Sequence, residues 1–191
     1  MKEEDIIEQC KKEKSYAQKE LYDIYAPKLR GVCRRYIIDT EESEDLLQNV
    51  FVQIFFNIQK FSWQGKGSLY AWAKRITINM AINHLKKNKN KWYEEAFDEC
   101  NELDIQSEEE ENIFNDNLER FSKQAIIEAF YKVPEPYSIV LNMYILDGMK
   151  HKEIAEILEI AEQTSRSRLT RGKKIFKEIL ITSEQYQQQT R

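Results

Sequence analysis

Glycine and proline are scarce in this sequence, with 5 Gly and 3 Pro in 191 residues. Such a composition disfavours architectures built from many strands and tight turns. No run approaches the roughly 18 apolar residues of a membrane-spanning helix. The first ten residues, MKEEDIIEQC, lack the apolar core of a signal peptide. We therefore expect an all-α protein of the cytoplasm, with no membrane insertion.

Cysteine, histidine and catalytic motifs are also sparse. Cys10, Cys33 and Cys100 are odd in number and form no CxxC pair, and His84 and His151 are the only histidines. This disfavours a zinc site or a disulfide framework, and Cys10 and Cys33 are expected to be buried thiols. A Gly-rich phosphate loop, HExxH and GxSxG are absent. We predict no catalytic residue, metal or cofactor, and no enzyme.

Charge is unevenly distributed along the chain, although the net charge is only −4. Residues 93–119 contain 12 acidic and no basic residues, whereas residues 1–92 carry a net +5 and residues 120–191 a net +3. The acidic stretch has isolated apolar residues without periodicity, so it cannot bury much surface. The pattern predicts two small helical domains, 1–92 and 120–191, joined by an acidic flexible linker, 93–119. A merely solubilising spacer would have the same charge.

In the first half, apolar residues at three- and four-residue spacing predict helix over Asp5–Ile38, with Pro27 kinking it or separating two helices. Asp39–Glu42 is predicted to be a turn, followed by an amphipathic helix over Ser43–Ile58. The buried side of that helix is expected to hold Leu46, Leu47, Val50, Phe51, Ile54, Phe55 and Ile58. Its polar side could be an ordinary solvated surface.

The stretch Phe61–Lys91 combines a Gly- and aromatic-containing loop with a long helix that begins at Ser68. Between Lys66 and Lys91 it holds seven Lys or Arg and no acid. The helix is apolar on two opposite sides, so both should be covered. The remaining stripe holds Trp72, Arg75, Asn79, Asn83 and Lys86. Trp72 could be the rim of the core, but its basic and amide neighbours favour contact with bases and phosphates.

The second half predicts a helix-turn-helix. We expect helices over Phe121–Lys132, from Pro136 to an end at Gly148, and over His151–Leu158. A three-residue break then leads to a basic helix over Glu162–Leu180, a typical helix-turn-helix layout. One stripe of this last helix has residues that read base edges or neutralise phosphates. It consists of Gln163, Ser167, Thr170 and Lys174, flanked by Arg166, Arg171 and Lys177. A basic solvated face is the alternative.

These strings resemble the sigma-70 family of bacterial transcription initiation factors, in particular its extracytoplasmic function (ECF) group. SEDLLQNVFVQIF resembles the helix that docks on core RNA polymerase, and GSLYAWAKRITINMAINHLKK the helix that engages the −10 promoter element. VPEPYSIVLNMYILDGMKHKEIAEIL and the basic helix after it resemble the −35-binding domain. The three occur in the family's order, around the acidic segment.

The resemblance implies a promoter-specificity factor that recruits core RNA polymerase to promoter DNA and melts the −10 region. Anti-sigma partners are frequent in the group. Implied polymerase-facing residues are Asp45, Gln48, Asn49 and Gln53. Implied −10 contacts are Phe61, Trp63 and Gly67, in a loop that holds an extruded base, with Trp72, Arg75, Asn79, Asn83 and Lys86. Implied −35 contacts are Gln163, Arg166, Ser167, Thr170, Arg171 and Lys174.

The sequence departs from the family pattern in two places. The turn of the helix-turn-helix reads Glu159, Ile160, Ala161 instead of a Gly followed by a Ser cap. A Glu at positive φ and a missing Ser cap each cost about 1 kcal/mol. Asn83 stands where Asp is common. A free-standing helix-turn-helix regulator is the alternative function, although it would not need a second DNA surface. A helical polymerase-binding inhibitor would not need the basic helix.

Overall fold

The computed structural model describes residues 2–88 and 121–189, and these ranges contain helices and no strand. The all-α prediction is therefore confirmed for the described chain. The chain divides into two compact units, Met1–Asn90 and Lys91–Arg191, which are taken separately below. The predicted linker, 93–119, and Cys100 lie outside the described residues.

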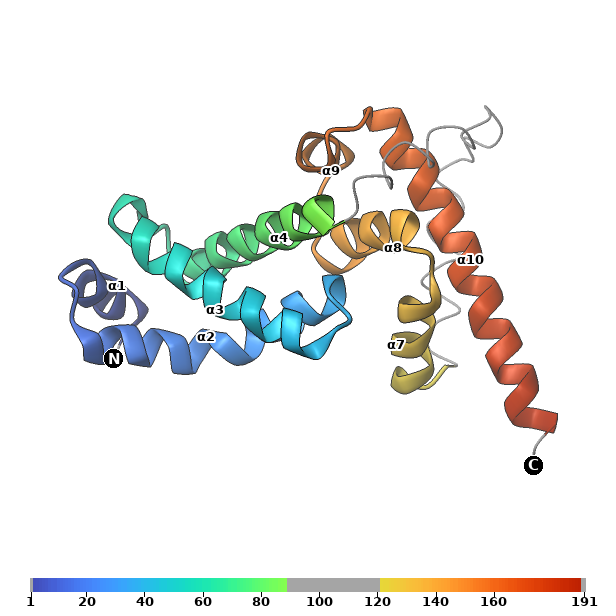
Figure 1. Cartoon of the computed structure of the whole chain (residues 1–191), viewed down its shortest axis with the longest axis horizontal. Helices are drawn as coiled ribbons and strands as arrows, with labels where there is room; N and C mark the ends of the chain where they lie inside the picture. Colours follow the sequence, from blue (N-terminus) through green and yellow to red (C-terminus); the bar gives the residue numbers. More distant parts are fainter. Residues whose placement is uncertain (1, 89–120, 190–191) are drawn as a thin grey trace. The chain divides into compact units, whose positions relative to one another are not determined.

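The first unit is a bundle built on three long helices. Its elements are α1 (Glu3–Lys11), α2 (Ser15–Tyr36), α3 (Thr40–Asn57), the short 3-10 helix η1 (Ile58–Lys60) and α4 (Ser68–Asn88). Helices α2, α3 and α4 pack against one another, and α1 covers α2 and η1 (Figure 1). The fully buried side chains at the centre include Leu21, Leu29, Leu47, Ile54, Ile78 and Ile82.

The helix break in the first 38 residues lies elsewhere than predicted. Helix α2 continues through Pro27, and the chain instead turns between α1 and α2 at residues 12–14. Pro27 is exposed, so water can solvate the backbone group that the missing N–H leaves without a partner. At the turn, Glu13 adopts φ 57°, and its N–H donates to the Cys10 carbonyl over 2.9 Å. Ile24 is one of the apolar residues at three- and four-residue spacing from which this helix was predicted, but its side chain is exposed.

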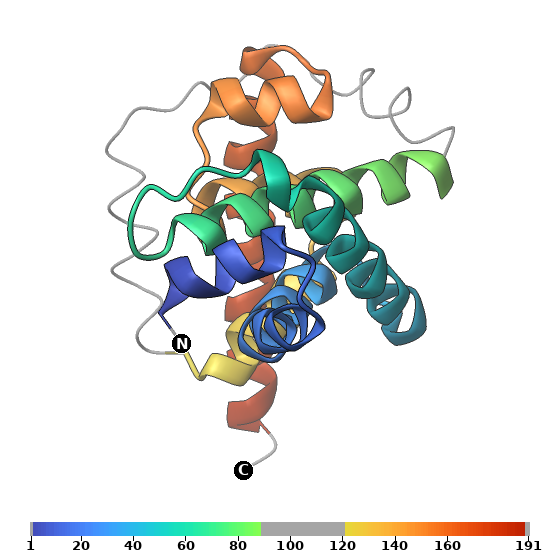
Figure 2. The ribbon, with the colours of Figure 1, turned by 90° about the vertical axis from the view of Figure 1, so that its left-hand side faces the viewer.

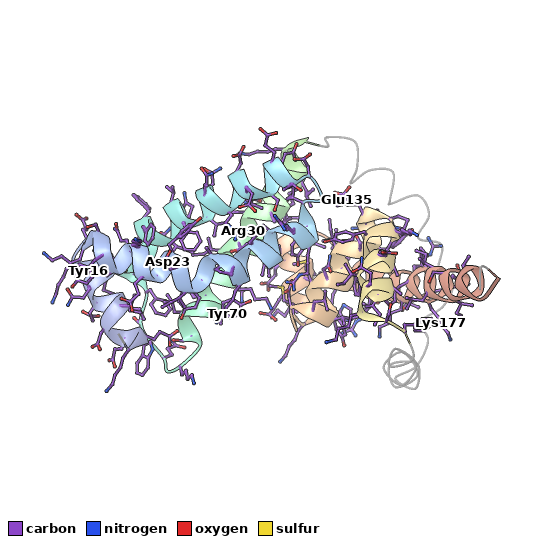
Figure 3. The ribbon with its side chains drawn as sticks, turned by 90° about the horizontal axis from the view of Figure 1, so that it is seen from below. Tyr16, Asp23, Arg30, Tyr70, Glu135 and Lys177 are labelled. Carbon is purple, nitrogen blue, oxygen red and sulfur yellow. The ribbon has the colours of Figure 1, made fainter. Side chains whose placement is uncertain are left out.

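Helix α3 begins at Thr40, three residues before its predicted start. Asp39 accepts a hydrogen bond from the Glu42 N–H over 2.9 Å and so caps the helix. Two arginines of α2 hold the same end, because Arg30, which Figure 3 labels, and Arg34 donate to the Glu44 carboxylate over 2.8 and 3.2 Å. The predicted apolar side is buried, apart from the half-buried Phe55.

Cys10 and Cys33 are buried free thiols, as predicted. Burial raises the pKa of Cys10 to about 11 and that of Cys33 to about 12. Both side chains are therefore protonated packing groups at neutral pH.

The second unit is organised along one long helix. Its elements are α7 (Lys123–Lys132), α8 (Glu135–Leu141), the π-helical turn η2 (Asn142–Leu146), α9 (His151–Leu158) and α10 (Glu162–Gln189). Helix α10 packs against α7, α8 and α9 (Figure 1). Ser122 caps α7 by accepting from the Ala125 N–H over 3.1 Å. Gly148, at φ 70°, ends the stretch that follows Pro136, as predicted. The last helix extends beyond the predicted Leu180.

Candidate nucleic-acid interface

The loop between η1 and α4 presents one aromatic ring and buries another. Gly65 and Gly67 adopt φ 106° and 90°, a region that favours glycine. Trp63 is 42% exposed, whereas Phe61 is only 7% exposed and packs against Trp72 with ring centroids 4.9 Å apart. Within the loop, Trp63 is thus the accessible stacking surface. Phe61 lies in the core, where it packs against the half-buried Trp72.

A carboxylate from the start of α1 reaches this loop. The Gly67 N–H and the Trp63 indole N–H donate to Oε2 of Glu3 over 3.2 and 3.4 Å. The Tyr25 hydroxyl of α2 donates to Oε1 over 2.5 Å. Partial burial would raise the pKa of Glu3, but the bonds from Tyr25, Gly67 and Trp63 and the charge of Lys28 outweigh it and lower that pKa. The sequence analysis did not identify Glu3.

The predicted stripe of α4 faces solvent. Arg75, Asn79 and Asn83 are exposed, and Trp72 and Lys86 are half-buried. The covered side contains the buried residues Leu69, Ala73, Thr77, Ile78, Ala81 and Ile82. Ala71, which the sequence analysis placed on a covered side, is exposed. The exposed stripe is therefore wider at its N-terminal end than predicted, on the side next to the loop.

Helix α3 presents a mixed amide and apolar face. The four residues predicted to face polymerase are all exposed, namely Asp45, Gln48, Asn49 and Gln53. Val52 and Phe56 are exposed as well, to 62% and 77%. Neither belongs to the apolar set expected on the buried side, but the resemblance assigned polymerase contacts only to polar residues, so neither was predicted as a docking residue. Large apolar side chains with such exposure among amides are typical of a protein-docking surface.

The α3 face continues into a groove of about 530 Å³ between α3 and α4. Asp45, Asn49 and Gln53 line it from α3, and Asn83 lines it from α4. Near one end, the His84 ring nitrogen lies 3.1 Å from Glu42. Asn83, predicted to contact DNA, therefore adjoins the residues predicted to contact polymerase.

In the second unit, α9 and α10 form a helix-turn-helix. Glu159 occupies the left-handed conformation, at φ 58° and ψ 41°, although this turn has no glycine. The His151 Nδ1 and the Ser165 hydroxyl, 2.9 Å apart, join the two helices. Ser165, Leu169, Gly172 and Phe176 are buried and form the inner side of α10. Arg168 is buried with them, only 3% exposed.

The opposite side of α10 is accessible. Gln163, Arg166 and Lys174 are exposed, and Ser167, Thr170 and Arg171 are half-buried. Ser167 and Thr170 donate to the carbonyls of Thr164 and Arg166, which leaves their oxygen lone pairs available as acceptors. In Figure 3, Lys177 points away from α10 on the accessible side.

Two of the arginines on this side are partly restrained. Arg166 pairs with Glu162 one turn earlier in α10. Arg171 lies 3.4 Å from the Tyr137 hydroxyl of α8. An exposed pair such as Glu162–Arg166 contributes little stability, so phosphate could displace the glutamate.

No group of His, Cys, Asp and Glu suited to a metal ion occurs among the described residues. Within the same ranges, no helix is long and apolar enough to cross a membrane. Two helical units, one of them a helix-turn-helix with an accessible basic helix, define the class of modular DNA-binding transcription proteins.

Comparisons with known proteins identify the family. The sigma-70 region 2 model matches residues 21–91, and the sigma-70 region 4 model matches residues 123–175. The ECF RNA polymerase sigma factor SigW of Bacillus subtilis is 29% identical over 91% of this chain and 94% of its own length. The ECF RNA polymerase sigma-E factor of Haemophilus influenzae is 26% identical over 80% and 81%, respectively.

The fold agrees with a solved structure. The sigma factor RpoE of Bartonella quintana, crystallised with the anti-sigma factor NepR, matches with a TM-score of 0.52 at 18% identity, over 85% of this chain and 95% of that one. The chain belongs to the sigma-70 family, in its extracytoplasmic function group, and is a promoter-specificity factor. The alternative of a free-standing helix-turn-helix regulator is not favoured.

Proposed function

We propose that the chain divides promoter recognition among three surfaces. The loop at Trp63 and the exposed stripe of α4 hold the −10 element, the accessible side of α10 reads the −35 element, and the α3 face docks on core RNA polymerase. The observation that carries this proposal is that the first unit exposes an amide and apolar face on α3 as well as the Trp63 loop and the Arg and Asn stripe of α4. A free-standing regulator needs neither in addition to its helix-turn-helix.

At the −10 element, the exposed ring of Trp63 supplies a stacking platform for an unpaired base. Base–aromatic stacking contributes about 1–3 kcal/mol per base, comparable with the cost of unstacking that base from the duplex. Arg75, Asn79 and Asn83 lie on the neighbouring helix, where cationic and amide groups hold the sugar-phosphate backbone. The loop thus stabilises the open strand while α4 retains it.

At the −35 element, the first turns of α10 carry Gln163, Arg166 and Ser167 towards the major groove. Arg and Gln side chains make bidentate bonds to purine edges, each worth about 1–3 kcal/mol of discrimination. Lys174 is two turns further along the helix, at a position suited to phosphate.

At the polymerase, Val52 and Phe56 supply the apolar anchor that the four polar residues of α3 lack. Burial of apolar surface favours association, and an aromatic side chain buried at the centre of an interface is a typical anchor of a protein complex. The amides around it orient the contact, and the factor acts in the cytoplasm, where core polymerase and promoter DNA are found. An anti-sigma factor is a further partner suggested by the relative crystallised with NepR.

The proposal is tested with purified protein and core RNA polymerase. We expect the two to co-elute, and transcription of fragmented genomic DNA from the source organism to start at sites that are silent with core alone. Failure of the wild-type chain to bind core would refute the proposed function.

Three single variants separate the surfaces. Trp63→Ala should reduce open-complex formation, measured by permanganate reactivity, more than it reduces duplex binding. Arg166→Ala should weaken −35 binding and leave core affinity unchanged. Phe56→Ala should weaken core binding, whereas Ile38→Ala, which truncates a similarly exposed apolar residue just before the start of α3, should not. If Trp63→Ala, Arg166→Ala and Phe56→Ala all lost the same core affinity, the assignment of separate functions to the three surfaces would be wrong.

A further inference from the structure

The N-terminal helix α1 lies beside the base-contacting loop and outside the segment that defines region 2. The region 2 match begins at residue 21, whereas α1 spans Glu3–Lys11. Figure 2 shows α1 next to the loop that joins η1 to α4. Ile6, Ile7 and Cys10 are buried and fix α1 on the bundle. The Gln59 amide of η1 also donates to the Lys11 carbonyl.

The carboxylate of Glu3 accepts hydrogen bonds from three donors in two separate segments, α2 and the loop. Tyr25 reaches it from α2, and Trp63 and Gly67 reach it from the loop, over 2.5, 3.4 and 3.2 Å. Tyr25 is itself buried and stacks against Tyr70 at the start of α4, with ring centroids 6.3 Å apart (Figure 3). The Lys28 ammonium lies 5.6 and 5.7 Å from the two ring centroids. The carboxylate thus connects α2, within the helical bundle, to the loop between η1 and α4.

The two loop donors, Gly67 and Trp63, are the residue with the unusual backbone conformation and the residue with the exposed ring. Gly67 has φ 90°, and the carboxylate accepts the N–H that this conformation turns towards α1. Trp63 is held through its indole N–H, at the edge of the ring. A bond at the edge restricts the rotation of the ring and leaves its face available for stacking.

We propose that Glu3 is a positioning residue that holds Trp63 and Gly67 in the base-capturing geometry, so that α1 acts as a brace for promoter opening. This inference rests on the proposed role of the loop. Immobilising a side chain before binding removes an entropic penalty that binding would otherwise incur. Loss of the brace should therefore weaken capture of the unpaired base and leave the other two surfaces unaffected.

Hydrogen exchange tests the brace without reference to function. In Glu3→Ala, the peptide that contains Gly67 should exchange faster than in wild type, and peptides from α3 and α10 should exchange at the wild-type rate. Glu3→Gln retains one acceptor oxygen and should give an intermediate rate. Glu4→Ala removes the same charge from the same first turn of α1, at an exposed residue, and should match wild type.

Promoter opening provides the second readout, with wild-type holoenzyme as reference. We expect permanganate-detected open complex to fall about three- to tenfold in Glu3→Ala, as estimated from one or two freed side chains. Core affinity and −35 duplex binding should stay unchanged in the same variant. A wild-type protein that does not open promoters would refute the proposed function and leave the exchange test of the brace valid. If Glu3→Ala and Glu4→Ala behave alike in both assays, the brace is wrong.

Discussion

The two glycines inside helices offer a matched test of how closely α10 packs on α8. A Cβ added at Gly31, in α2, would meet no atom within 4 Å. A Cβ added at Gly172, in α10, would lie 3.3 Å from Cδ1 of Leu141 and 3.3 Å from the carbonyl oxygen of Tyr137. The same substitution, Gly→Ala, therefore probes an open site in one unit and a crowded site in the other.

The two substitutions are expected to change the free energy of unfolding in opposite directions. Alanine is favoured over glycine in a helix interior by about 0.5–1 kcal/mol, and at Gly31 nothing opposes that gain. At Gly172 the methyl group crowds a backbone carbonyl, which cannot rotate away as a side chain can. Overpacking costs about 1–3 kcal/mol, which exceeds the gain in helix propensity. Gly172→Ala should therefore lower the free energy of unfolding by about 1 kcal/mol net.

Calorimetry with hydrogen exchange, used to assign each transition to its unit, measures both effects. A change of 1 kcal/mol corresponds to a Tm shift of about 4–8 °C in a domain of this size. Gly31→Ala should raise the Tm of the first unit, and Gly172→Ala should lower that of the second. The Gly172 variant should also bind the −35 duplex less tightly, because α10 is displaced. If both variants raised Tm equally, the close approach of α10 and α8 would be refuted.

Three other predictions concern single side chains. Glu159→Gly should raise the free energy of unfolding of the second unit by about 1 kcal/mol, since glycine adopts φ 58° without strain; urea unfolding that shows no gain would contradict this. The hydrogen bond from Arg30, with the charges of Arg30 and Arg34, lowers the pKa of Glu44 below the usual 4.5. The stabilisation that ionised Glu44 provides is therefore complete above pH 4.5 and is lost as the pH falls through the lowered pKa. Glu44→Gln should thus flatten this part of the acid unfolding curve. An unchanged curve would exclude a stabilising pair between Glu44 and Arg30. An alkylating reagent at pH about 8 should leave Cys10 and Cys33 unmodified in the native protein, because thiolate is the reactive form; rapid labelling would show that they are accessible.

Most helices were predictable because their signals are local. The apolar period of α3, the glycine after the stretch that begins at Pro136 and the bounds of α9 all depend on residues within a few positions of one another. The turn at Glu13 was missed because its sequence, KKEK, contains no glycine or proline. The sequence pattern predicted a kink or a break at Pro27, whereas α2 continues through that residue. The effect of a proline depends on whether the helix face around it is open to water, which a helical pattern does not indicate.

The candidate site shows the same division. The accessible side of α10 follows from its own sequence, as does the stripe of α4 from Arg75 to Asn83. The burial of Phe61 and the exposure of Phe56 do not follow from the local sequence, because each depends on whether another helix covers that position. Glu3 was beyond prediction, since its loop partners are 60 and 64 residues away in the chain.

The sequence alone determined the helical class, the charge partition, the absence of metal and catalytic motifs, and the basic character of the two helices proposed to bind DNA. These properties are sums over residues or short-range patterns, so they do not depend on packing. Only the tertiary structure decided which apolar side chains of α3 stay exposed and which carboxylate accepts hydrogen bonds from the loop at Trp63. Such contacts form when distant segments pack together, and their geometry follows from the whole bundle.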